Sequence, residues 1–329
     1  MDGIKESQIV LADLRPDQDS FLEEVLTGLS KEQKELPCKY FYDERGSFLF
    51  ENICTVDEYY IPQAEREIMQ ARIQEIVDQL GRGVLLVEYG CGDCRKTRIL
   101  LENLRELAAY VPIDISWDQL LRVSGELGSE YPAIELLPVC ADYTNHFELP
   151  MAQQPVDRRV VYFPGSTIGN FDPAEARSFL ERIATVCGPG GAVLIGVDLK
   201  KDPRVLHAAY NDSRGVTAAF NLNLLERINR ELDCDFQLDQ FEHYAFYNPG
   251  EGRVEMHLVS LREQFVHLDG MTIPFCEGES IWTENSYKYG LGEFERLAAG
   301  AGFRVKRVWT DKRRWFSVQY LSNLGGFIP

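Results

Sequence analysis

The sequence predicts an α/β fold in which an open, mostly parallel sheet carries helices on both faces and is joined to a second, α+β lobe. Short apolar runs alternate with amphipathic stretches between residues 84 and 200, as in parallel sheets that are covered on both faces. A glycine-rich turn follows the first run, as in strand–turn–helix units that bind nucleosides. The alternation stops between residues 200 and 290 and then returns, which indicates an inserted lobe.

The N-terminal region precedes this alternation and has a different composition. Residues 1–36 are acidic with a helical pattern, residues 39–60 are rich in aromatic side chains, and a long helix is expected over 64–80. The alternating part then predicts five strands, near 84–89, 110–115, 135–139, 159–164 and 191–197. Amphipathic segments between them predict helices near 96–108, 117–128 and 173–187.

The insertion and the C-terminal part complete the predicted fold. We expect a helix over 216–232, strands over 244–248 and 253–261, a second helix over 292–300, and closing strands over 304–309 and 315–321. A closing hairpin gives a seven-stranded sheet with one antiparallel edge, which is the element order of the Rossmann-like class I methyltransferase architecture. We therefore expect a cofactor-binding domain at 62–200 plus 291–329 and a substrate-binding lobe at 1–61 plus 201–290.

Composition narrows the classes of partner. The chain has 329 residues and a formal net charge of −18, which disfavours nucleic acids and anionic membranes because both need a basic surface. No apolar run approaches the length of a membrane-spanning helix, and the first seven residues lack a signal-peptide pattern. We expect a cytoplasmic monomer that acts on a small molecule.

Cysteine and histidine spacing does not predict a metal site. The eight cysteines are scattered, as expected for reduced thiols, and the five histidines form no H-x-x-x-H motif. Cys91 and Cys94 form one C-x-x-C pair inside the glycine turn. This pair has three interpretations: a structural zinc site, a redox switch, or two small residues that fit a crowded loop.

The turn Gly90-Cys91-Gly92 is the first candidate ligand site. A dinucleotide-binding turn would have a third glycine at position 95, where this chain has Arg95, so the turn disfavours NAD and FAD. An acidic residue before the turn, and Asp114 at the end of the next strand, favour S-adenosylmethionine (AdoMet) instead. A carboxylate at that strand end can bind the ribose hydroxyls.

Three more side chains could complete a cofactor site. Asp142 and Tyr143 follow the third strand of the series, where an acid can bind the adenine amino group and an aromatic ring can cover the base. Lys96 could bind the carboxylate of the methionine moiety. The alternative interpretations are a helix N-cap for Asp142 and a solvated lysine for Lys96.

Candidate substrate contacts lie in two further segments. Asn170 follows the fourth strand, and strand ends of this type border the ligand crevice of open α/β sheets, although asparagine before Asp-Pro is also a common turn residue. In a strand, Glu284 and Ser286 point to one face and could bind both nitrogens of an imidazole. A solvated strand face explains the same pattern equally well.

Several segments together resemble one family, the histidine Nα-methyltransferases of ergothioneine biosynthesis. The resemblance runs from about residue 36 to residue 321. The segments that carry it are Lys39-Tyr40-Phe41-Tyr42-Asp43, Glu58-Tyr59-Tyr60, Gly165-Ser166-Thr167-Ile168-Gly169-Asn170, Gly215-Val216-Thr217-Ala218-Ala219-Phe220-Asn221, and Thr283-Glu284 with Ser286. Two departures stand out: cysteines occupy the glycine turn where many relatives have serine and threonine, and position 285 is Asn285. Asn285 could add a polar contact to the substrate or could face away from it.

The resemblance implies roles for individual residues. The cofactor contacts it implies are Tyr42, Gly90, Lys96, Asp114, Asp142 and Tyr143. Tyr59, Asn170 and Tyr210 would hold the amino-acid backbone of the substrate, with Tyr59 and Asn170 as the catalytic pair. Gly165 and Met256 would line the same pocket, and Glu284 and Ser286 would recognise the imidazole, with Asn285 between them in the sequence as a further substrate contact.

The activity implied is AdoMet-dependent trimethylation of the α-amino group of L-histidine, through its mono- and dimethyl forms, to give hercynine. S-adenosylhomocysteine would be the co-product. An Nα-methyltransferase for tryptophan or a histidine derivative is the nearest alternative, although Glu284 favours histidine over an indole. A non-catalytic AdoMet-binding protein is another alternative, and a sulfoxide synthase would need a histidine iron site that the sequence lacks.

Overall fold

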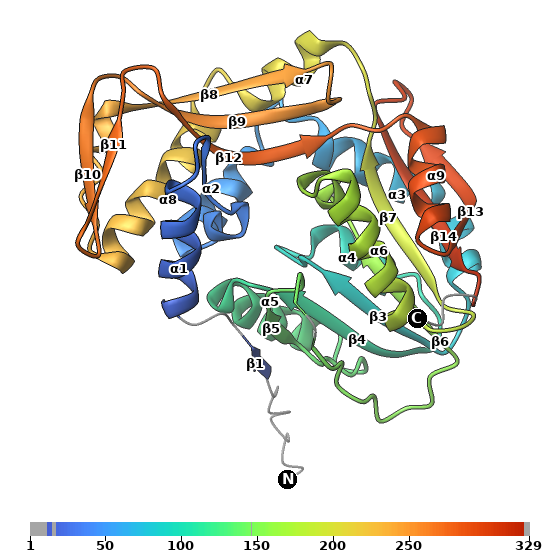
Figure 1. Cartoon of the computed structure of the whole chain (residues 1–329). Helices are drawn as coiled ribbons and strands as arrows, with labels where there is room; N and C mark the ends of the chain where they lie inside the picture. The colour runs from blue at the N-terminus through green and yellow to red at the C-terminus, as the bar shows by residue number, and fades with distance from the viewer. Residues whose placement is uncertain (1–11, 15–17, 146, 326–329) are drawn as a thin grey trace.

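The computed structural model describes residues 12–14, 18–145 and 147–325, so residues 1–7 and His146 lie outside the described residues. Its central sheet has eight strands in the order β1-β5-β4-β3-β6-β7-β14-β13 (Figure 1). These strands are β1 (Ala12–Leu14), β3 (Val84–Tyr89), β4 (Leu107–Asp114), β5 (Val139–Ala141), β6 (Arg158–Phe163), β7 (Ala192–Asp198), β13 (Phe303–Thr310) and β14 (Phe316–Asn323).

The predicted seven-stranded arrangement is present within this sheet. Strands β3 to β7 pair in parallel, while β14 is antiparallel to both β7 and β13. The eighth strand, β1, was not predicted; it pairs in parallel with β5 at the edge of the sheet. Its sequence, Ala-Asp-Leu, has no apolar pattern, because an exposed edge strand of three residues is defined by backbone pairing alone.

Helices cover both faces of the sheet, as predicted. The alternate side chains of the strands divide into two cores, one packed against α3 (Ile61–Leu80), α4 (Arg95–Leu101) and α5 (Trp117–Glu130). The other core packs against α6 (Pro173–Cys187) and α9 (Leu291–Gly300). Both faces of β3 are therefore buried, which explains the apolar run over its first four residues, 84–87.

Two predicted boundaries were wrong. The helix expected over 96–108 ends at Leu101, and β4 already begins at Leu107. The strand expected over 135–139 is formed at Val139–Ala141, with only one isolated bridge, between Tyr110 and Leu136, before it. Pro138 explains the shift, because proline has no N–H to donate to a neighbouring strand.

The second layer of the molecule is a four-stranded sheet in the order β2-β12-β9-β8, which lies above the central sheet in Figure 1. Its strands are β2 (Lys34–Glu35), β8 (Phe241–Asn248), β9 (Arg253–Ser260) and β12 (Ser280–Tyr287). Helices α1 (Gln18–Leu29), α2 (Glu44–Ile53), α7 (Pro203–Tyr210) and α8 (Val216–Leu232) accompany it. The N-terminal region and the insertion thus share one sheet, through the β2–β12 pairing.

Some elements of this layer were not predicted. The hairpin β10 (Gln264–Leu268) and β11 (Met271–Phe275), and helices α2 and α7, had no counterpart in the sequence analysis. Helix α8 has the predicted bounds. No helix within the described parts of the chain is both long enough and apolar enough to cross a membrane.

Candidate active site

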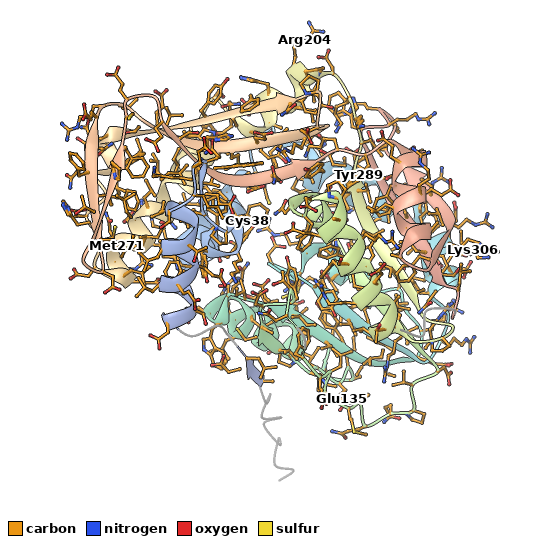
Figure 2. All side chains as sticks on the ribbon, viewed as in Figure 1. Cys38, Glu135, Arg204, Met271, Tyr289 and Lys306 are labelled. Carbon is orange, nitrogen blue, oxygen red and sulfur yellow. The ribbon has the colours of Figure 1, made fainter. Side chains whose placement is uncertain are left out.

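A cavity of about 440 Å³ lies between the carboxyl ends of the central strands and the N-terminal segment. Figure 2 shows Cys38, one of its lining residues, between the two sheets. Nine of the predicted site residues border this cavity: Tyr42, Tyr59, Gly90, Lys96, Asp114, Asp142, Tyr143, Gly165 and Asn170. The fold therefore brings the predicted cofactor contacts together with two of the predicted contacts to the substrate backbone.

The glycine turn is fixed by its backbone and by Asp114. Gly90 has φ +72° and Gly92 has φ +53°, a left-handed conformation that favours glycine. The Gly90 N–H donates to the Ile113 carbonyl at 2.8 Å, and the Gly92 N–H donates to Asp114 Oδ2 at 2.9 Å. Burial raises the pKa of Asp114, but three backbone N–H groups oppose this effect. The carboxylate is thus held at the cavity wall, with unused lone pairs to accept ribose hydroxyls.

Asp142 and Tyr143 form the next part of the wall. Thr144 donates to Asp142 Oδ1 through its N–H at 2.9 Å, and Lys39 Nζ donates to Oδ2 at 3.1 Å. Burial opposes ionisation of Asp142, but these partners outweigh it and lower the pKa. Asp142 does not cap a helix, because a loop follows it. The Tyr143 ring packs against Tyr89 and lies 3.8 Å from the Cβ position of Gly90, so it covers the turn.

Lys96 is held by a buried carboxylate that the sequence analysis did not identify. Its Nζ donates to Glu65 Oε2 at 2.6 Å, and the same oxygen accepts the Gly165 N–H at 2.9 Å. Glu65 is fully buried, whereas the Lys96 side chain is 22% exposed, so the ammonium reaches the cavity. Burial lowers the pKa of Lys96, but the Glu65 charge outweighs it and raises the pKa. Lys96 is therefore a fixed cation, not a freely solvated one.

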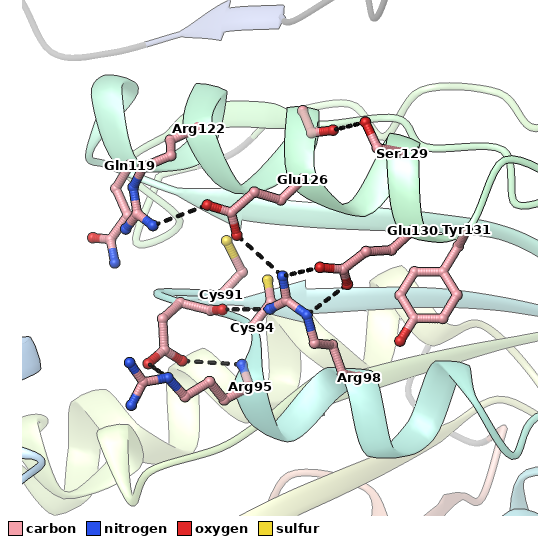
Figure 3. A network of polar contacts seen from close by, with 12 residues as sticks. Cys91, Cys94, Arg95, Arg98, Gln119, Arg122, Glu126, Ser129, Glu130 and Tyr131 are labelled. Carbon is pink, nitrogen blue, oxygen red and sulfur yellow. Dashed lines mark hydrogen bonds and ion pairs between the residues drawn. The ribbon is translucent and has the colours of Figure 1, made fainter.

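The cysteines of the turn are buried, and an arginine network anchors the turn from outside (Figure 3). Arg98 donates to the Asp93 carbonyl at 2.9 Å and to Glu130 Oε2 at 2.8 Å. A mutual hydrogen bond and burial raise the pKa of Cys91 well above its ordinary value, and the pKa of Cys94 is also raised. Protonated thiols favour the structural interpretation of the pair. No group of three possible metal ligands occurs in the described residues. A redox switch stays the alternative interpretation of the pair.

The backbone conformation of the loop after β6 explains why its sequence is rich in glycine. Gly165 has φ +76° and Ser166 has φ +62°. A Cβ on Gly169 would come within 2.7 Å of the Tyr287 carbonyl, so glycine permits this loop to approach β12. The short helix η2 (Thr167–Asn170) therefore places Asn170 both at the cavity and next to the upper sheet.

The remaining substrate residues lie behind the cavity wall. Tyr210, Met256, Glu284 and Ser286 do not border the cavity, but the Tyr59 ring, which does, meets the Tyr210 ring edge-on with centroids 6.0 Å apart. Glu284 is opposite Met256 in the β12–β9 pair, and Ser286 shares their face. The structure thus brings the predicted imidazole pair next to the predicted backbone contacts.

The position of Asn285 on β12 corrects its predicted role as a substrate contact. Successive side chains of a strand point to opposite faces, and the β12–β9 register is regular from Glu284 onward. Asn285 is therefore opposite Glu255, on the face away from Glu284 and Ser286. This position contradicts a contact between Asn285 and the same ligand and agrees with the alternative that Asn285 faces away.

Burial raises the pKa of Glu284 to about 7, and the Lys288 ammonium reduces this effect. Burial raises the pKa of three cavity-lining groups, Cys38, Tyr42 and Tyr59, and the Glu284 charge adds to this effect, so the carboxylate lies close behind the wall. Sequence spacing did not reveal Lys288, although it belongs to the same segment as Glu284.

This pKa predicts a stability effect in the absence of ligand. Because the folded pKa is about 7 and the ordinary value is 4.5, the protonated carboxyl stabilises the fold at low pH. That contribution is lost as the pH rises through 7. Glu284→Gln should therefore raise the free energy of unfolding relative to the unmodified chain by about 2 kcal/mol more at pH 8 than at pH 5. Urea unfolding at the two pH values measures the difference, and an equal effect at both would contradict the burial of this group.

The fold and the cofactor turn define an AdoMet-dependent methyltransferase of class I. The chain belongs to the histidine-specific, AdoMet-dependent methyltransferases, because the model of that family matches residues 21–323. The histidine N-alpha-methyltransferases of Mycolicibacterium smegmatis and Mycobacterium tuberculosis are each 41% identical to it, over 88% of this chain and 90% of their own. Ergothioneine biosynthesis protein 1 of Neurospora crassa is 30% identical over 84% of this chain and 32% of its own. The family model confirms the predicted family and the predicted cofactor, and these relatives confirm the family.

Proposed function

We propose that this enzyme transfers three methyl groups from AdoMet to the α-amino group of L-histidine, giving hercynine for ergothioneine biosynthesis. The observation that carries the proposal is the pairing of Glu284 and Ser286 on one face of β12, directly behind the cavity wall. A buried carboxylate beside a hydroxyl suits the two nitrogens of an imidazole and would leave an indole with one unmatched polar group. The 41% identity to histidine N-alpha-methyltransferases supports the same substrate.

Different residues of the cavity would bind different parts of the cofactor. Bound AdoMet supplies an activated methyl group on its sulfonium, and Asp114, Asp142 and Lys96 would hold its ribose, adenine and carboxylate. Tyr42, which borders the same cavity, would complete that set. AdoMet fits these residues because the left-handed turn at Gly90 exposes backbone at the cavity, while fixed carboxylates and one fixed ammonium face it.

Tyr59 and Asn170 would orient the α-amine. Burial raises the pKa of Tyr59 well above its ordinary value, so the phenol stays neutral and acts as a hydrogen-bonding group, not as a base. Methyl transfer needs the free amine with its lone pair aimed at the donor. We therefore propose that Tyr59 and Asn170 aim this lone pair while water carries the amine proton away.

Mass spectrometry of the products tests the proposal. The purified chain is incubated with AdoMet and L-histidine, and with L-tryptophan and hercynine precursors in parallel. A gain of three methyl groups on the α-nitrogen of histidine is the expected result. Turnover of tryptophan alone would overturn the substrate, and AdoMet binding without any methylated amino acid would overturn the catalytic role.

Tyr59→Phe is expected to reduce kcat/KM for histidine by about tenfold, because it removes one hydrogen bond from the amine and leaves the ring in place. Steady-state rates with histidine and with its dimethyl form measure the loss. Tyr244→Phe is the matched control, since Tyr244 is 52% exposed on β8 and does not line the cavity. An unchanged rate for Tyr59→Phe would remove Tyr59 from the mechanism.

We further propose the division predicted from the sequence, a methyltransferase domain at 62–200 plus 291–329 and a substrate lobe at 1–61 plus 201–290. The shared sheet of β2 and β12 supports it. We also propose a cytoplasmic monomer. None of the eight cysteines, all of which lie in the described residues, forms a disulfide, which agrees with a reducing compartment. Light scattering of the purified chain tests the oligomeric state.

A further inference from the structure

Lys288 is a fully buried lysine next to the proposed imidazole pair. Its ammonium lies 2.9 Å from Asp198 Oδ2, and it donates to the Tyr210 hydroxyl at 2.9 Å and to Ser286 Oγ at 2.7 Å. An ammonium has three N–H donors and no acceptor. All three protons of Lys288 are therefore used, and the direction of each of these bonds is fixed.

The fixed donors determine what Ser286 can do. The Tyr210 hydroxyl accepts from Lys288 and donates its own proton to Ser286 Oγ at 2.7 Å. Ser286 Oγ thus receives two hydrogen bonds, which fill the two lone pairs of a hydroxyl oxygen. Within the described ranges, no acceptor is assigned to the Ser286 proton, so this proton is available to a ligand.

We propose that Lys288 fixes Ser286 as a hydrogen-bond donor, so that the enzyme selects the neutral imidazole of histidine and rejects the imidazolium. This inference rests on the proposed function. A neutral imidazole has one N–H and one lone pair. The N–H suits the Glu284 carboxylate and the lone pair suits the Ser286 proton, whereas the second N–H of an imidazolium would meet that proton head-on.

The balance of buried charge also favours a neutral imidazole over an imidazolium. Lys201 Nζ lies 2.6 Å from Asp198 Oδ1, so two lysines face two carboxylates, those of Asp198 and Glu284. Asp198 raises the pKa of Lys288 against the effect of burial, which keeps this ammonium charged. An imidazolium would add an unbalanced positive charge. The other titratable groups that face this region from neighbouring elements include neutral phenols and a thiol, Tyr42, Tyr59, Tyr60, Tyr210 and Cys38. The carboxylate of Asp311 also acts on Lys201, but it lies 3.9 Å from the Arg313 guanidinium, which balances its charge.

The test compares L-histidine with 2-fluoro-L-histidine, whose electron-poor ring stays neutral between pH 5.5 and 8. The ratio of their kcat/KM values cancels the ionisation of Glu284 and of the α-amine, which affect both substrates. Below about pH 6.5, the ratio of the fluoro analogue to histidine should rise about tenfold per pH unit. A flat ratio, or one that falls with decreasing pH, would overturn the inference.

Two variants test whether Lys288, acting through Ser286, causes the pH dependence of this ratio. Lys288→Met removes the donors to Ser286 and lets this hydroxyl turn and accept, so the ratio should become nearly independent of pH. Ser286→Ala should flatten it in the same way and serves if Lys288→Met does not fold. Lys200→Met is the matched control, because Lys200 is 43% exposed and pairs with Glu293, and it should keep the steep ratio.

Each outcome separates this inference from the function on which it rests. A steep ratio in Lys288→Met would show that Lys288 does not set the direction of the Ser286 bond. Failure of the proposed function would appear differently, as no methylated histidine at any pH in the unmodified enzyme. A positioning residue that only supported the fold would change stability and leave the pH dependence of the ratio intact.

Discussion

Glu284→Ala is expected to lower kcat/KM for L-histidine by about 10- to 100-fold and to relax the choice of side chain. A hydrogen bond to a charged group contributes about 1.5–3 kcal/mol, and each 1.4 kcal/mol is tenfold in affinity. The carboxylate lies close behind the wall of the cavity, where burial already raises its pKa to about 7. Desolvation of this kind makes an unpaired carboxylate costly, so only a side chain with a matching N–H offsets the cost.

The measurement is kcat/KM for L-histidine and for an analogue of similar size without ring N–H groups, thienyl-L-alanine. The variant should lose activity toward histidine while the analogue changes little or gains. Glu242→Ala is the control, because Glu242 is an exposed glutamate on β8 of the same sheet. Selectivity retained in Glu284→Ala would place imidazole recognition elsewhere in the site.

The parts of the fold that could be predicted are those whose causes are local. Helices α6 and α8 have the predicted bounds because strong signals define their ends. Asp172 and Glu175 form a capping box at the start of α6, Gly188 ends it, and Gly215 precedes α8. Strand β3 also has its predicted bounds, because a short apolar run between glycines is typical of a buried strand.

The elements that were missed depend on pairing with distant segments. Strand β1 has no pattern of its own and is defined by its register with Val139–Ala141. The hairpin β10–β11 has alternating burial, but its exposed positions include Phe265 and Met271, which obscure the polar side of the pattern. Propensity and periodicity do not report such context.

The site residues also fall into two groups, those predicted from local sequence and those that depend on distant segments. The glycine turn and Asp114 could be predicted from the residues because one strand–turn–helix unit and the next strand end contain them. The substrate contacts came from the resemblance, since Tyr59, Tyr210 and Ser286 meet only in three dimensions. Their buried partners gave no signal at all: Glu65 is 100 residues from Gly165, and Asp198 is 90 residues from Lys288.

Lys96→Met is expected to reduce both stability and cofactor binding. It removes the cation that faces the fully buried Glu65 carboxylate, and breaking a buried ion pair by deleting one partner costs about 3–5 kcal/mol. We expect a loss near the lower end, about 3 kcal/mol, because Lys96 is 22% exposed and water can replace part of its effect. Urea unfolding measures this loss, and titration with AdoMet measures binding.

The double variant Glu65→Gln with Lys96→Met separates the two roles. A neutral amide at position 65 still accepts the Gly165 N–H through its carbonyl oxygen and leaves no unpaired charge, so most of the lost stability should return. Affinity for AdoMet should not return, because Lys96 is the cation that we propose binds the carboxylate of its methionine moiety. Recovery of both properties would mean that Lys96 serves only to neutralise Glu65, and the cofactor carboxylate would then need another partner at the cavity wall.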